Sequence, residues 1–553
     1  MSRRLPTVVV ASFLAMVVGC SGRDEALVRR QTADMKKGLA SAPADVRRDR
    51  DRATLWKTMR DLYASRGYEP IWIDGTHPTK RFDSLVAALQ EMRTHGIDPE
   101  RYDVAALTAA RAGTTRGWFR SGKGLDEHAV VPLDIKATWA WVRGAADLSA
   151  GAADIEGPAD KLWRLRRQKI DFQKELASAI DGGSPEDQFQ KLAPTHAEYL
   201  RLKDAYTNYV AIAEAGGWKS LPATLALKKG DRSPHLPALA ERLQITGDLA
   251  AGEASETREI FDDELSAAVA HFQRRHGLEP DGVLGRQVVA EMNVPVASRI
   301  RQLELNLERW RWLPRDLGER YIFVNVPEYR LEVHEGERIP LRMNVITGAK
   351  GTPTPIFRDT MTHIVFSPYW NVPDGIAAGE TLPAVQSDPS FLDRNRIEVV
   401  GTSGTVVDPA TVDWSSATDD GAFPYRFRQR PGSSNSLGLV KFVFPNEHDV
   451  YLHDTPADSL FTRAYRALSH GCVRLEQPQA LAEYLLKDQP EWTPERITAA
   501  MHAGEEKHVK LSRPVPVHLL YWTARVSEDG VVHFRQDVYG RDMRELGNLM
   551  ARQ

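Results

Sequence analysis

Residues 321–326 read YIFVNV, residues 329–333 read YRLEV, and residues 341–346 read LRMNVI. In these short runs apolar and β-branched side chains alternate with polar ones, which is typical of β-strands. The run VKFVF at 440–444 repeats the pattern. We therefore predict a β-rich domain over residues 298–553.

Residues 374–430 interrupt this β-rich pattern with an excess of Asp, Ser, Pro and Gly. The interruption is longer than a plain connection between strands. We interpret it as an insertion that forms either a mobile cap over a functional site or a surface extension without a catalytic role. Beyond the insertion, one helix is predicted in the β-rich domain, at 478–487, because Pro478 suits the first position of a helix.

Residues 230–297 precede the β-rich part and are predicted to form a compact helical unit. Leu265, Val269 and Phe272 share one helical face, and Gly277 suits the left-handed end of that helix. The Phe-Gln, Gly-Leu, Asp-Gly and Leu-Gly elements follow in the order that resembles the common bacterial peptidoglycan-binding domain. The alternative is a helical spacer of the same shape without affinity for glycan.

Residues 51–229 show apolar side chains at helical spacing, as in Leu85, Leu89 and Met92. We predict a mostly helical scaffold domain there, and nothing in it resembles a catalytic constellation. Residues 21–50 are poor in large apolar side chains and are predicted to form a flexible tether. The fold class expected for the chain is therefore multidomain α+β.

The N-terminus is predicted to be a signal peptide over residues 1–20. Its apolar run at 8–18 is too short to span a bilayer, which needs ~20 apolar residues, but has the length of a signal-peptide core. The sequence VVGC at 17–20 resembles the lipobox of bacterial lipoproteins, which implies that Cys20 is lipidated and anchors the protein in the periplasm. By the same resemblance, Ser21 implies delivery to the outer membrane. The alternative is a secretory signal with a chance cysteine.

Length and composition limit the classes of protein. At 553 residues the chain is too long for a single core, and 42% hydrophobic with 27% charged residues is typical of folded soluble protein. The formal net charge of -3 gives no indication of a nucleic-acid partner. The oligomeric state is not indicated by the sequence.

Only two cysteines occur in the sequence. Exported proteins normally pair their thiols as disulfides, so with Cys20 assigned to lipid, Cys472 has no partner and is a candidate reactive thiol. The alternative is a buried, inert cysteine.

Cys472 lies within SHGCVR at 469–474, and His453 lies nineteen residues upstream. A nucleophilic thiol needs a base or a positive environment, and acyl transfer needs donors for the developing oxyanion. If 450–453 ends a strand, Tyr451 and His453 point to the same face. Nearby lie further candidates: a second base, His470, a cation, Arg474, and two oxyanion-donor amides, those of Gly471 and Cys472.

The upstream histidine, its spacing and the SHGC sequence together resemble the signature of the L,D-transpeptidase family, bacterial cysteine enzymes that cross-link peptidoglycan. The resemblance to the large, multidomain branch of that family extends to the predicted scaffold and to five short motifs: TPTP at 352–355, PYWNVP at 368–373, PGSSNSLG at 431–438, FPN at 444–446 and DVYGRD at 537–542. It implies that residues 298–553 form a β-rich L,D-transpeptidase catalytic domain with a capping insertion at about 374–430.

The resemblance also implies a role for each residue. Cys472 would attack the carbonyl of the third residue, a diamino acid, in a donor tetrapeptide stem and release the terminal D-Ala. His453 would act as general base, and Tyr451 would shape the pocket and assist the oxyanion. Further implied residues are Ser469, His470, Gly471 and Arg474 in the catalytic loop, and Trp370 and Asn435 in substrate binding.

Two positions depart from family patterns. Arg474 stands where compact members carry Asn, so the contact of that Asn cannot be transferred. His470 stands where members of the large branch often carry Ser, which leaves two candidate bases. We favour His453, because it can approach from another part of the fold, whereas the turn between His470 and Cys472 can aim their side chains apart.

Several alternatives remain open at this level. His453, Asp454, His470 and Cys472 could instead bind zinc, since their donor types suit it, although the spacing is not that of a zincin. The chain could also be a wall-binding lipoprotein with an inactive catalytic domain. Within the enzyme hypothesis the acyl acceptor could be a second stem peptide, water or a lipoprotein lysine. No cofactor is expected, and the expected partners are stem peptides, glycan strands and, through the lipid anchor, a membrane.

Overall fold

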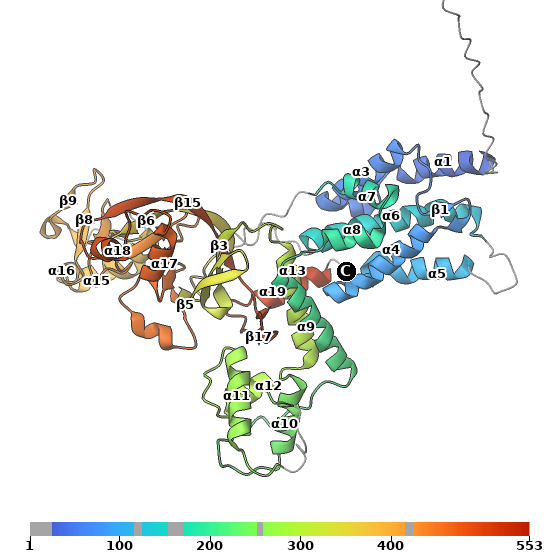
Figure 1. Ribbon diagram of the computed structural model, residues 1–553. Coiled ribbons are helices and arrows are strands. Elements are labelled where there is room, and N and C mark those ends of the chain that lie inside the picture. The colour runs from blue at the N-terminus through green and yellow to red at the C-terminus, as the bar shows by residue number, and fades with distance from the viewer. Residues whose placement is uncertain (1–24, 115–123, 153–169, 251–257, 415–423, 552–553) are drawn as a thin grey trace, which may run out of the picture. The chain divides into compact units, whose positions relative to one another are not determined.

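The computed structural model describes residues 25–114, 124–152, 170–250, 258–414 and 424–551. The chain divides into two compact units (Figure 1). The first comprises Met1–Glu91, Pro99–Ala145 and Asp171–Gln190, and the second comprises Met92–Asp98, Ala146–Ile170 and Lys191–Gln553. Within the described ranges, no helix is both long enough and apolar enough to cross a bilayer.

The first unit is mainly helical, as predicted for this part of the chain. Its elements are α1 (Glu25–Leu39), α2 (Ala44–Arg48), α3 (Arg50–Ser65), β1 (Ile73–Asp74), β2 (His77–Pro78), α4 (Lys80–Glu91), η2 (Pro99–Tyr102), α5 (Val104–Thr114), α6 (Glu127–Ala150), α7 (Phe172–Asp181) and α8 (Pro185–Leu192). The strands β1 and β2 form a small antiparallel hairpin, and α6 and α8 continue into residues of the second unit.

A buried carboxylate joins α3, α6 and the segment before β1. Asp134 on α6 is fully buried and accepts hydrogen bonds from the amides of Ile71 (3.0 Å) and Trp72 (2.8 Å) and from the Tyr63 hydroxyl (2.5 Å). Burial raises the pKa of Asp134 to about 6, and these hydrogen bonds act in the opposite direction. Each donor that faces Asp134 therefore has an acceptor, and the cluster fixes the fold locally.

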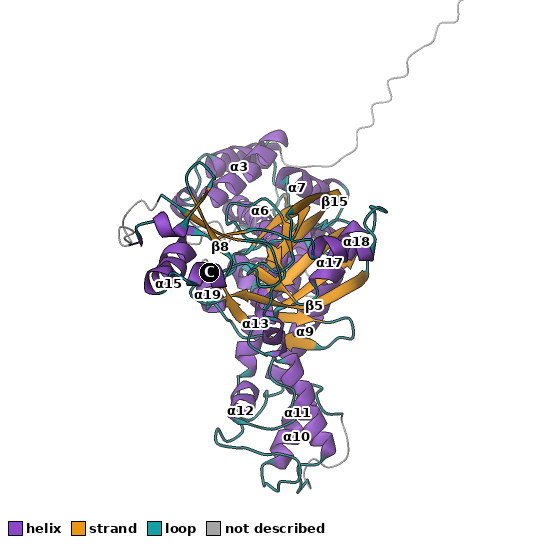
Figure 2. Ribbon diagram, turned by 90° about the vertical axis from the view of Figure 1, so that its left-hand side faces the viewer, coloured by secondary structure: helices purple, strands orange, loops and turns teal. Residues whose placement is uncertain are grey.

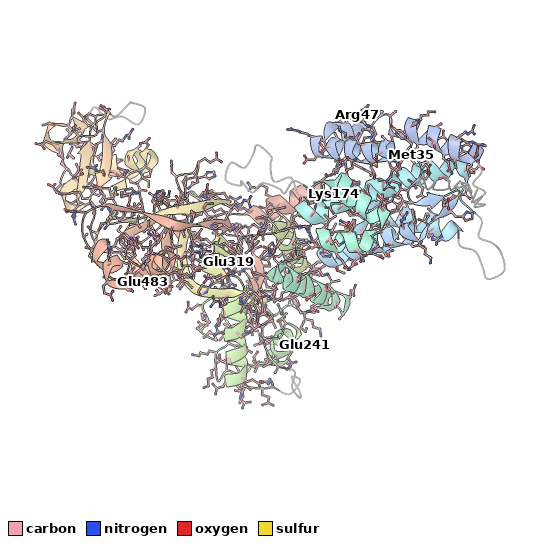
Figure 3. The ribbon with its side chains drawn as sticks, turned by 45° about the horizontal axis from the view of Figure 1, so that its top comes forward. Met35, Arg47, Lys174, Glu241, Glu319 and Glu483 are labelled. Atoms are coloured by element: carbon pink, nitrogen blue, oxygen red, sulfur yellow. The ribbon has the colours of Figure 1, made fainter. Side chains whose placement is uncertain are left out.

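The flexible tether predicted for residues 21–50 is wrong where the structure describes this segment. Helices α1 and α2 occupy most of it, and Gln31, Met35 and Leu39 are buried on one side of α1 (Met35 is labelled in Figure 3). Residues at i, i+4 spacing lie on one helical face, so a few of them suffice to pack α1 into the first unit. A low overall content of apolar residues does not reveal this spacing.

The predicted scaffold boundaries, 51–229, do not coincide with one compact unit. Residues Met92–Asp98 and helix α9 (Ala197–Glu214) belong to the second unit. Tyr199 and Leu202 of α9 pack in one core with Trp310 of α13 (Val296–Arg311) and Trp522. These residues lie far apart in the sequence, and their packing against one another decides that α9 belongs to the second unit.

The predicted helical binding unit has a core of its own. It contains α10 (Leu236–Ile245), α11 (Asp263–Arg275) and α12 (Arg286–Met292). Leu265, Val269 and Phe272 are all buried on α11, which confirms their common face. Gly277, just after α11, has a φ of 67°, which confirms the predicted left-handed end.

The β-rich part is built on a nine-stranded sheet in the order β13-β5-β14-β12-β11-β6-β15-β3-β4, with an additional pairing between β5 and β4. That pairing closes eight of the strands into a ring, which β13 joins at β5. The strands are β3 (Arg320–Asn325), β4 (Arg330–Glu335), β5 (Arg338–Gly348), β6 (Phe357–Phe366), β11 (Val440–Val443), β12 (Leu452–His453), β13 (Ala467–Ser469), β14 (Val473–Leu475) and β15 (Lys507–Leu520). β3, β4, β5 and β11 confirm the four predicted strands.

Helices α17 (Pro478–Leu486) and α18 (Pro494–Met501) cover the sheet core, as Figure 2 shows. Leu481, Leu485 and Ile497 are buried in that core. α17 confirms the predicted late helix, whereas α18 and α19 (Arg541–Ala551) were not predicted. Further elements are η1 (Met92–His95), η4 (Val326–Glu328), η8 (Asp458–Thr462), β16 (Ala524–Val526) and β17 (Val532–Phe534).

The insertion folds as a small subdomain, which we call the cap. It carries the antiparallel sheet β7-β10-β8-β9 and a separate core that includes Val385, Val399 and Phe427. Its elements are β7 (Trp370–Asn371), α14 (Asp374–Ile376), the π-helical turn η5 (Ala377–Thr381), α15 (Leu382–Ser387), α16 (Phe391–Arg394), β8 (Ile397–Val400), β9 (Val406–Val407), η6 (Pro409–Thr411) and β10 (Arg426–Gln429). The excess of polar and turn residues therefore conceals a compact core.

Candidate active site

Cys472 lies in the short loop between β13 and β14. The Ser469 hydroxyl donates to the Cys472 carbonyl (2.5 Å) and accepts from the Gly471 amide (3.1 Å). Gly471 has a φ of 117°, a conformation that favours glycine, so the predicted tight turn before the nucleophile is confirmed. The Gly471 amide, one of the two predicted oxyanion donors, is engaged within the loop.

Two threonines of the TPTP motif hold this loop from outside. The Thr352 hydroxyl donates to the Ser469 carbonyl (3.0 Å), and the Thr354 hydroxyl donates to the Gly471 carbonyl (2.8 Å). Thr354 is fully buried and also accepts from the amide of Gly348 at the end of β5 (2.8 Å). The hydrogen bonds from the two threonines therefore hold the backbone of the Cys472 loop in place.

Strand β12 runs parallel to β14 and brings two predicted site residues to the loop. The Val473 amide donates to the Tyr451 carbonyl (3.2 Å). The rings of Tyr451 and His453 lie 5.8 Å apart, which confirms that they share a face. The Tyr451 hydroxyl is hydrogen-bonded to Cys472, whose thiol also points to the carbonyl of Asp449 at 3.9 Å.

The thiol and the imidazole are both neutral at neutral pH. Burial raises the pKa of Cys472, with Tyr451 and Arg474 acting in the opposite direction. Burial, and then the positive charge of Arg474, lower the pKa of His453 to about 3. The Nδ1 of His453 lies 2.5 Å from the Asp454 carbonyl, so a neutral ring donates there. Both shifts favour the uncharged forms of the Cys472 thiol and the His453 imidazole.

Two cations flank this centre. Arg474 follows Cys472 on β14, and its buried Nε has no hydrogen-bond partner in the described part of the chain. Lys441 on β11 pairs across the sheet with His453, and its Nζ lies 5.4 Å from the centre of the Tyr451 ring. Lys441 is absent from the sequence prediction, because the run VKFVF has the alternation of an ordinary half-exposed strand.

His470 points away from this centre. Its Nε2 lies 2.7 Å from a carboxylate oxygen of Glu380 in the cap turn η5, and both side chains are substantially exposed (47% and 60%). The structure thus separates the two candidate bases: His453 lies beside Tyr451 within the sheet, and His470 contacts the cap.

The role in substrate binding predicted for Asn435 stays a prediction, and the structure shows what its side chain contacts. Asn435 is fully buried, and its amide nitrogen donates to the carbonyls of Pro368 (3.1 Å) and Arg430 (3.0 Å). Its side-chain oxygen accepts from the Leu437 amide (2.8 Å). Asn435 therefore fixes the loop before β11. Trp370, the other predicted substrate-binding residue, is partly buried against the core of the cap.

Two further predictions concern a zinc site and the N-terminal signal peptide. Across the described ranges, no group of three or more His, Cys, Asp or Glu side chains is arranged to hold a metal ion, and His453, Asp454, His470 and Cys472 do not form one. Cys20, Ser21 and the predicted signal peptide lie outside the described residues.

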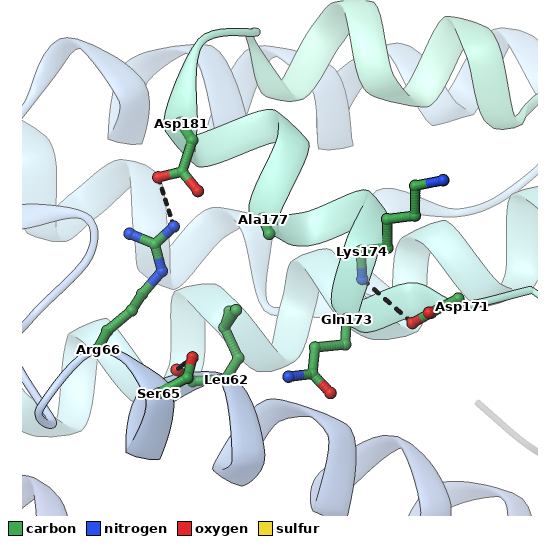
Figure 4. A pocket seen from close by; sticks show the side chains of 8 residues that line it. All are labelled: Leu62, Ser65, Arg66, Asp171, Gln173, Lys174, Ala177 and Asp181. Atoms are coloured by element: carbon green, nitrogen blue, oxygen red, sulfur yellow. Dashed lines mark hydrogen bonds and ion pairs between the residues drawn. The ribbon is translucent and has the colours of Figure 1, made fainter.

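A cavity of about 430 Å³ lies in the first unit and holds none of the predicted catalytic residues (Figure 4). Arg66 and Asp181 form an ion pair across it, and the Lys174 amide donates to Asp171 (3.1 Å). Four of its polar lining residues thus already have partners within the unit, namely Ser65, Arg66, Asp171 and Asp181. The full lining is Leu62, Ser65, Arg66, Asp171, Gln173, Lys174, Ala177 and Asp181.

Three separate regions of the chain match known families. Residues 319–498 match the L,D-transpeptidase catalytic domain, residues 57–205 match the scaffold domain, and residues 233–292 match the family described as "Putative peptidoglycan binding domain". These three matches support the L,D-transpeptidase family, and the catalytic-domain match itself spans residues 319–498 of the chain.

Among individual proteins, the chain is 36% identical over 242 residues to a protein of Haemophilus influenzae named "Putative L,D-transpeptidase". The match covers 44% of this chain and 48% of that protein, so the chain spans about half the length of its curated relative.

The solved structures that comparison finds include L,D-transpeptidases from Stackebrandtia nassauensis and Mycobacterium smegmatis, both at low identity and low TM-score. The first is 14% identical with a TM-score of 0.22 and covers 54% of this chain and 97% of that one. The second is 13% identical with a TM-score of 0.18 and covers 36% and 58%.

Proposed function

We propose that the protein is a peptidoglycan L,D-transpeptidase with Cys472 as its nucleophile. One observation carries the proposal: within the part that matches the catalytic domain, strands β12 and β14 place Tyr451 and His453 beside the loop of the lone described cysteine. A thiol, a neutral imidazole and a hydroxyl on one face are the groups that acyl transfer through a thioester requires.

In the proposed first half-reaction, the sulfur of Cys472 attacks the carbonyl of the third residue of a donor tetrapeptide. The thiol proton passes to His453, whose ring is held in place by the hydrogen bond between its Nδ1 and the Asp454 carbonyl. The carbon–nitrogen bond to the terminal D-Ala then breaks, the leaving amine takes the proton, and a thioester remains. The Tyr451 hydroxyl and the Cys472 amide are the proposed oxyanion donors.

In the proposed second half-reaction, the side-chain amine of a second stem attacks the thioester. His453 accepts the amine proton and returns it to the departing sulfur, which regenerates the thiol and leaves a cross-link between two third residues. Water as the acceptor would make the enzyme a carboxypeptidase or endopeptidase, and a lipoprotein lysine would make it an anchoring enzyme. We place the stem peptide first, because the chain joins scaffold and peptidoglycan-binding domains to the catalytic one.

The test is incubation of the enzyme with a disaccharide tetrapeptide, followed by mass analysis of products and of the intact protein. Cross-linked dimers with loss of one D-Ala support transpeptidation, and tripeptides alone support hydrolysis. The Cys472→Ala variant should yield neither product nor covalent adduct, including the adduct that the family resemblance predicts with a carbapenem. Turnover by the Cys472→Ala variant would contradict the proposal. Loss of wild-type turnover on addition of a metal chelator would also contradict it.

We further propose that the chain is exported and held by lipid at Cys20 in the periplasm, at the outer membrane as Ser21 implies. Metabolic labelling with a tagged fatty acid should mark the wild type but not Cys20→Ala.

Binding of the protein to isolated peptidoglycan, measured with Cys472→Ala so that catalysis does not retain it, tests the peptidoglycan-binding domain. If Cys472→Ala binds peptidoglycan and the wild type forms neither cross-linked nor trimmed peptides, the protein is a wall-binding lipoprotein with an inactive catalytic domain.

A further inference from the structure

Strand register aligns three basic residues in one row across the sheet. Lys441 on β11 pairs with His453 on β12, and His453 pairs with Arg474 on β14. Directly paired residues of neighbouring strands point to the same face. With strands about 4.8 Å apart, the backbones of Lys441 and Arg474 lie roughly 10 Å from each other, on either side of His453.

Lys441 forms no ion pair with a carboxylate in the part of the chain that the structure describes. It is partly buried, and Glu506 is the acid that acts on its charge. Glu506 already accepts from the Tyr369 amide (2.7 Å) and lies 3.1 Å from His508. Burial accordingly lowers the pKa of Lys441, and the Cys472 thiolate is one of the two groups that oppose this effect.

Arg474 shows the same lack of compensation from the other side. Its Nε is buried without a hydrogen-bond partner, and Cys472 is the group that opposes the lowering of its pKa by burial. A partly buried cation with little compensation is stabilised by an anion that approaches it. Lys441 and Arg474 are both partly buried beside one thiol, so together they favour an anion that arrives with the substrate.

The donor of the proposed function supplies an anion at the right place. The terminal carboxylate of a tetrapeptide stem is attached to the carbon that follows the scissile nitrogen, about 2.5 Å away. When Cys472 reaches the scissile carbonyl, this carboxylate must lie next to the residues that surround the thiol. A lysine ammonium is a compact charge suited to it.

We propose that Lys441 binds the terminal carboxylate of the donor stem and thereby selects donors that end one residue after the scissile bond. The inference rests on the proposed function. It assigns Lys441 a role in positioning the substrate, with Arg474 providing further positive charge on the other side of His453. A donor extended by one residue, or with its terminus blocked as an amide, places no charge at this position.

The test compares tetrapeptide donors that end in a free acid or in an amide, with kcat/KM for release of D-Ala or its amide as the readout. The wild type should prefer the acid by about 10- to 100-fold, the range for a hydrogen bond to a charged group. Lys441→Met should lower kcat/KM for the acid by a similar factor and leave the amide within about twofold. Lys441→Arg should recover most of the preference.

Lys507→Met is the matched control. Lys507 lies on the same sheet in β15, but its Nζ stacks on the Trp492 ring at 5.0 Å. It should leave both donors unchanged. The third residue of the donor used above is a diamino acid with a side-chain carboxylate, and a third donor carries lysine there, a diamino acid without that carboxylate. If the effect of Lys441→Met vanishes with the lysine donor, Lys441 binds the side-chain carboxylate and the proposal is overturned.

Equal losses for both donors in Lys441→Met would assign Lys441 a structural or thiol-activating role and overturn the proposal. So would an unchanged preference for the acid. Absence of any Cys472-dependent turnover by the wild type is a different result, since it would overturn the proposed function and this inference with it.

Discussion

Two buried polar clusters in this molecule differ in whether their groups have partners. In the first unit, Asp134 accepts from two amides and from Tyr63, so its charge is surrounded by donors. In the catalytic sheet, Arg474 has a buried Nε without a partner, and Lys441 forms no ion pair in the part of the chain that the structure describes.

The difference separates a structural role from a functional one. A buried group whose hydrogen bonds are complete stabilises one conformation and has nothing left to offer a ligand. A buried cation without a partner destabilises the free protein unless a ligand completes it. The hydrogen-bond partners distinguish the two clusters: Asp134 has a full set of donors, and the Nε of Arg474 has no partner in the described residues.

The largest expected effect is on the catalytic side of this comparison. His453→Gln should lower the rate of thioester formation by about 10²- to 10⁴-fold, the usual contribution of a general base. Rapid-quench mass analysis of the acylated enzyme measures that rate. His470→Gln is the matched control and should change it by no more than about threefold, because His470 contacts the exposed Glu380. Equal losses in both variants would contradict the assignment of the base.

On the structural side, Asp134→Ala should lower the free energy of unfolding of the first unit by about 3 kcal/mol. The amides of Ile71 and Trp72 and the Tyr63 hydroxyl would lose their acceptor. Denaturant titration followed by tryptophan fluorescence measures the change. Asp181→Asn removes an exposed ion pair with Arg66 and should cost at most about 1 kcal/mol. If both variants lost equal stability, the completed cluster would not be what stabilises the unit.

A smaller effect concerns the pH dependence of the thiol. Burial raises the pKa of Cys472, so alkylation by a neutral reagent, which requires the thiolate, should still increase with pH at pH 9. Arg474→Met removes a positive charge that lowers this pKa, so the curve should shift to higher pH and alkylation at pH 8 should slow severalfold. A shift to lower pH would contradict the position assigned to Arg474. Loss of alkylation in Cys472→Ala verifies the site of labelling.

The smallest effect is expected for the contact between the cap and the catalytic loop. His470 and Glu380 are exposed, and exposed ion pairs contribute about 0–1 kcal/mol. Glu380→Gln, His470→Gln and the double variant should therefore show a coupling of less than about 1 kcal/mol in thioester formation. A larger coupling would show that this pair, although exposed, contributes to the catalytic site.

Much of the organisation follows from local patterns in the sequence. Alternating side chains predicted β3, β4, β5 and β11, and the common face of Leu265, Val269 and Phe272 predicted α11. The tight turn at Gly471 also follows from its neighbours. These features depend on residues that are close along the chain, so a short window of sequence is enough to specify them.

Features that the sequence did not predict arise where packing between distant segments decides. Met35 and Leu39 bury α1, although residues 21–50 are polar on average. Asn435 lies in a motif that suggested substrate binding, and the contacts of its amide with the carbonyls of Pro368 and Arg430 were not predicted.

The sequence by itself determined that Cys472 is presented by a tight loop in a β-rich domain, and that a histidine and a tyrosine lie on one face upstream. Only the tertiary structure decided that His453 lies beside this loop while His470 contacts the cap, and that Lys441 joins the row. The physical reason is the pairing of β11, β12 and β14, because strand register sets which side chains share a face across segments that are not adjacent in the sequence.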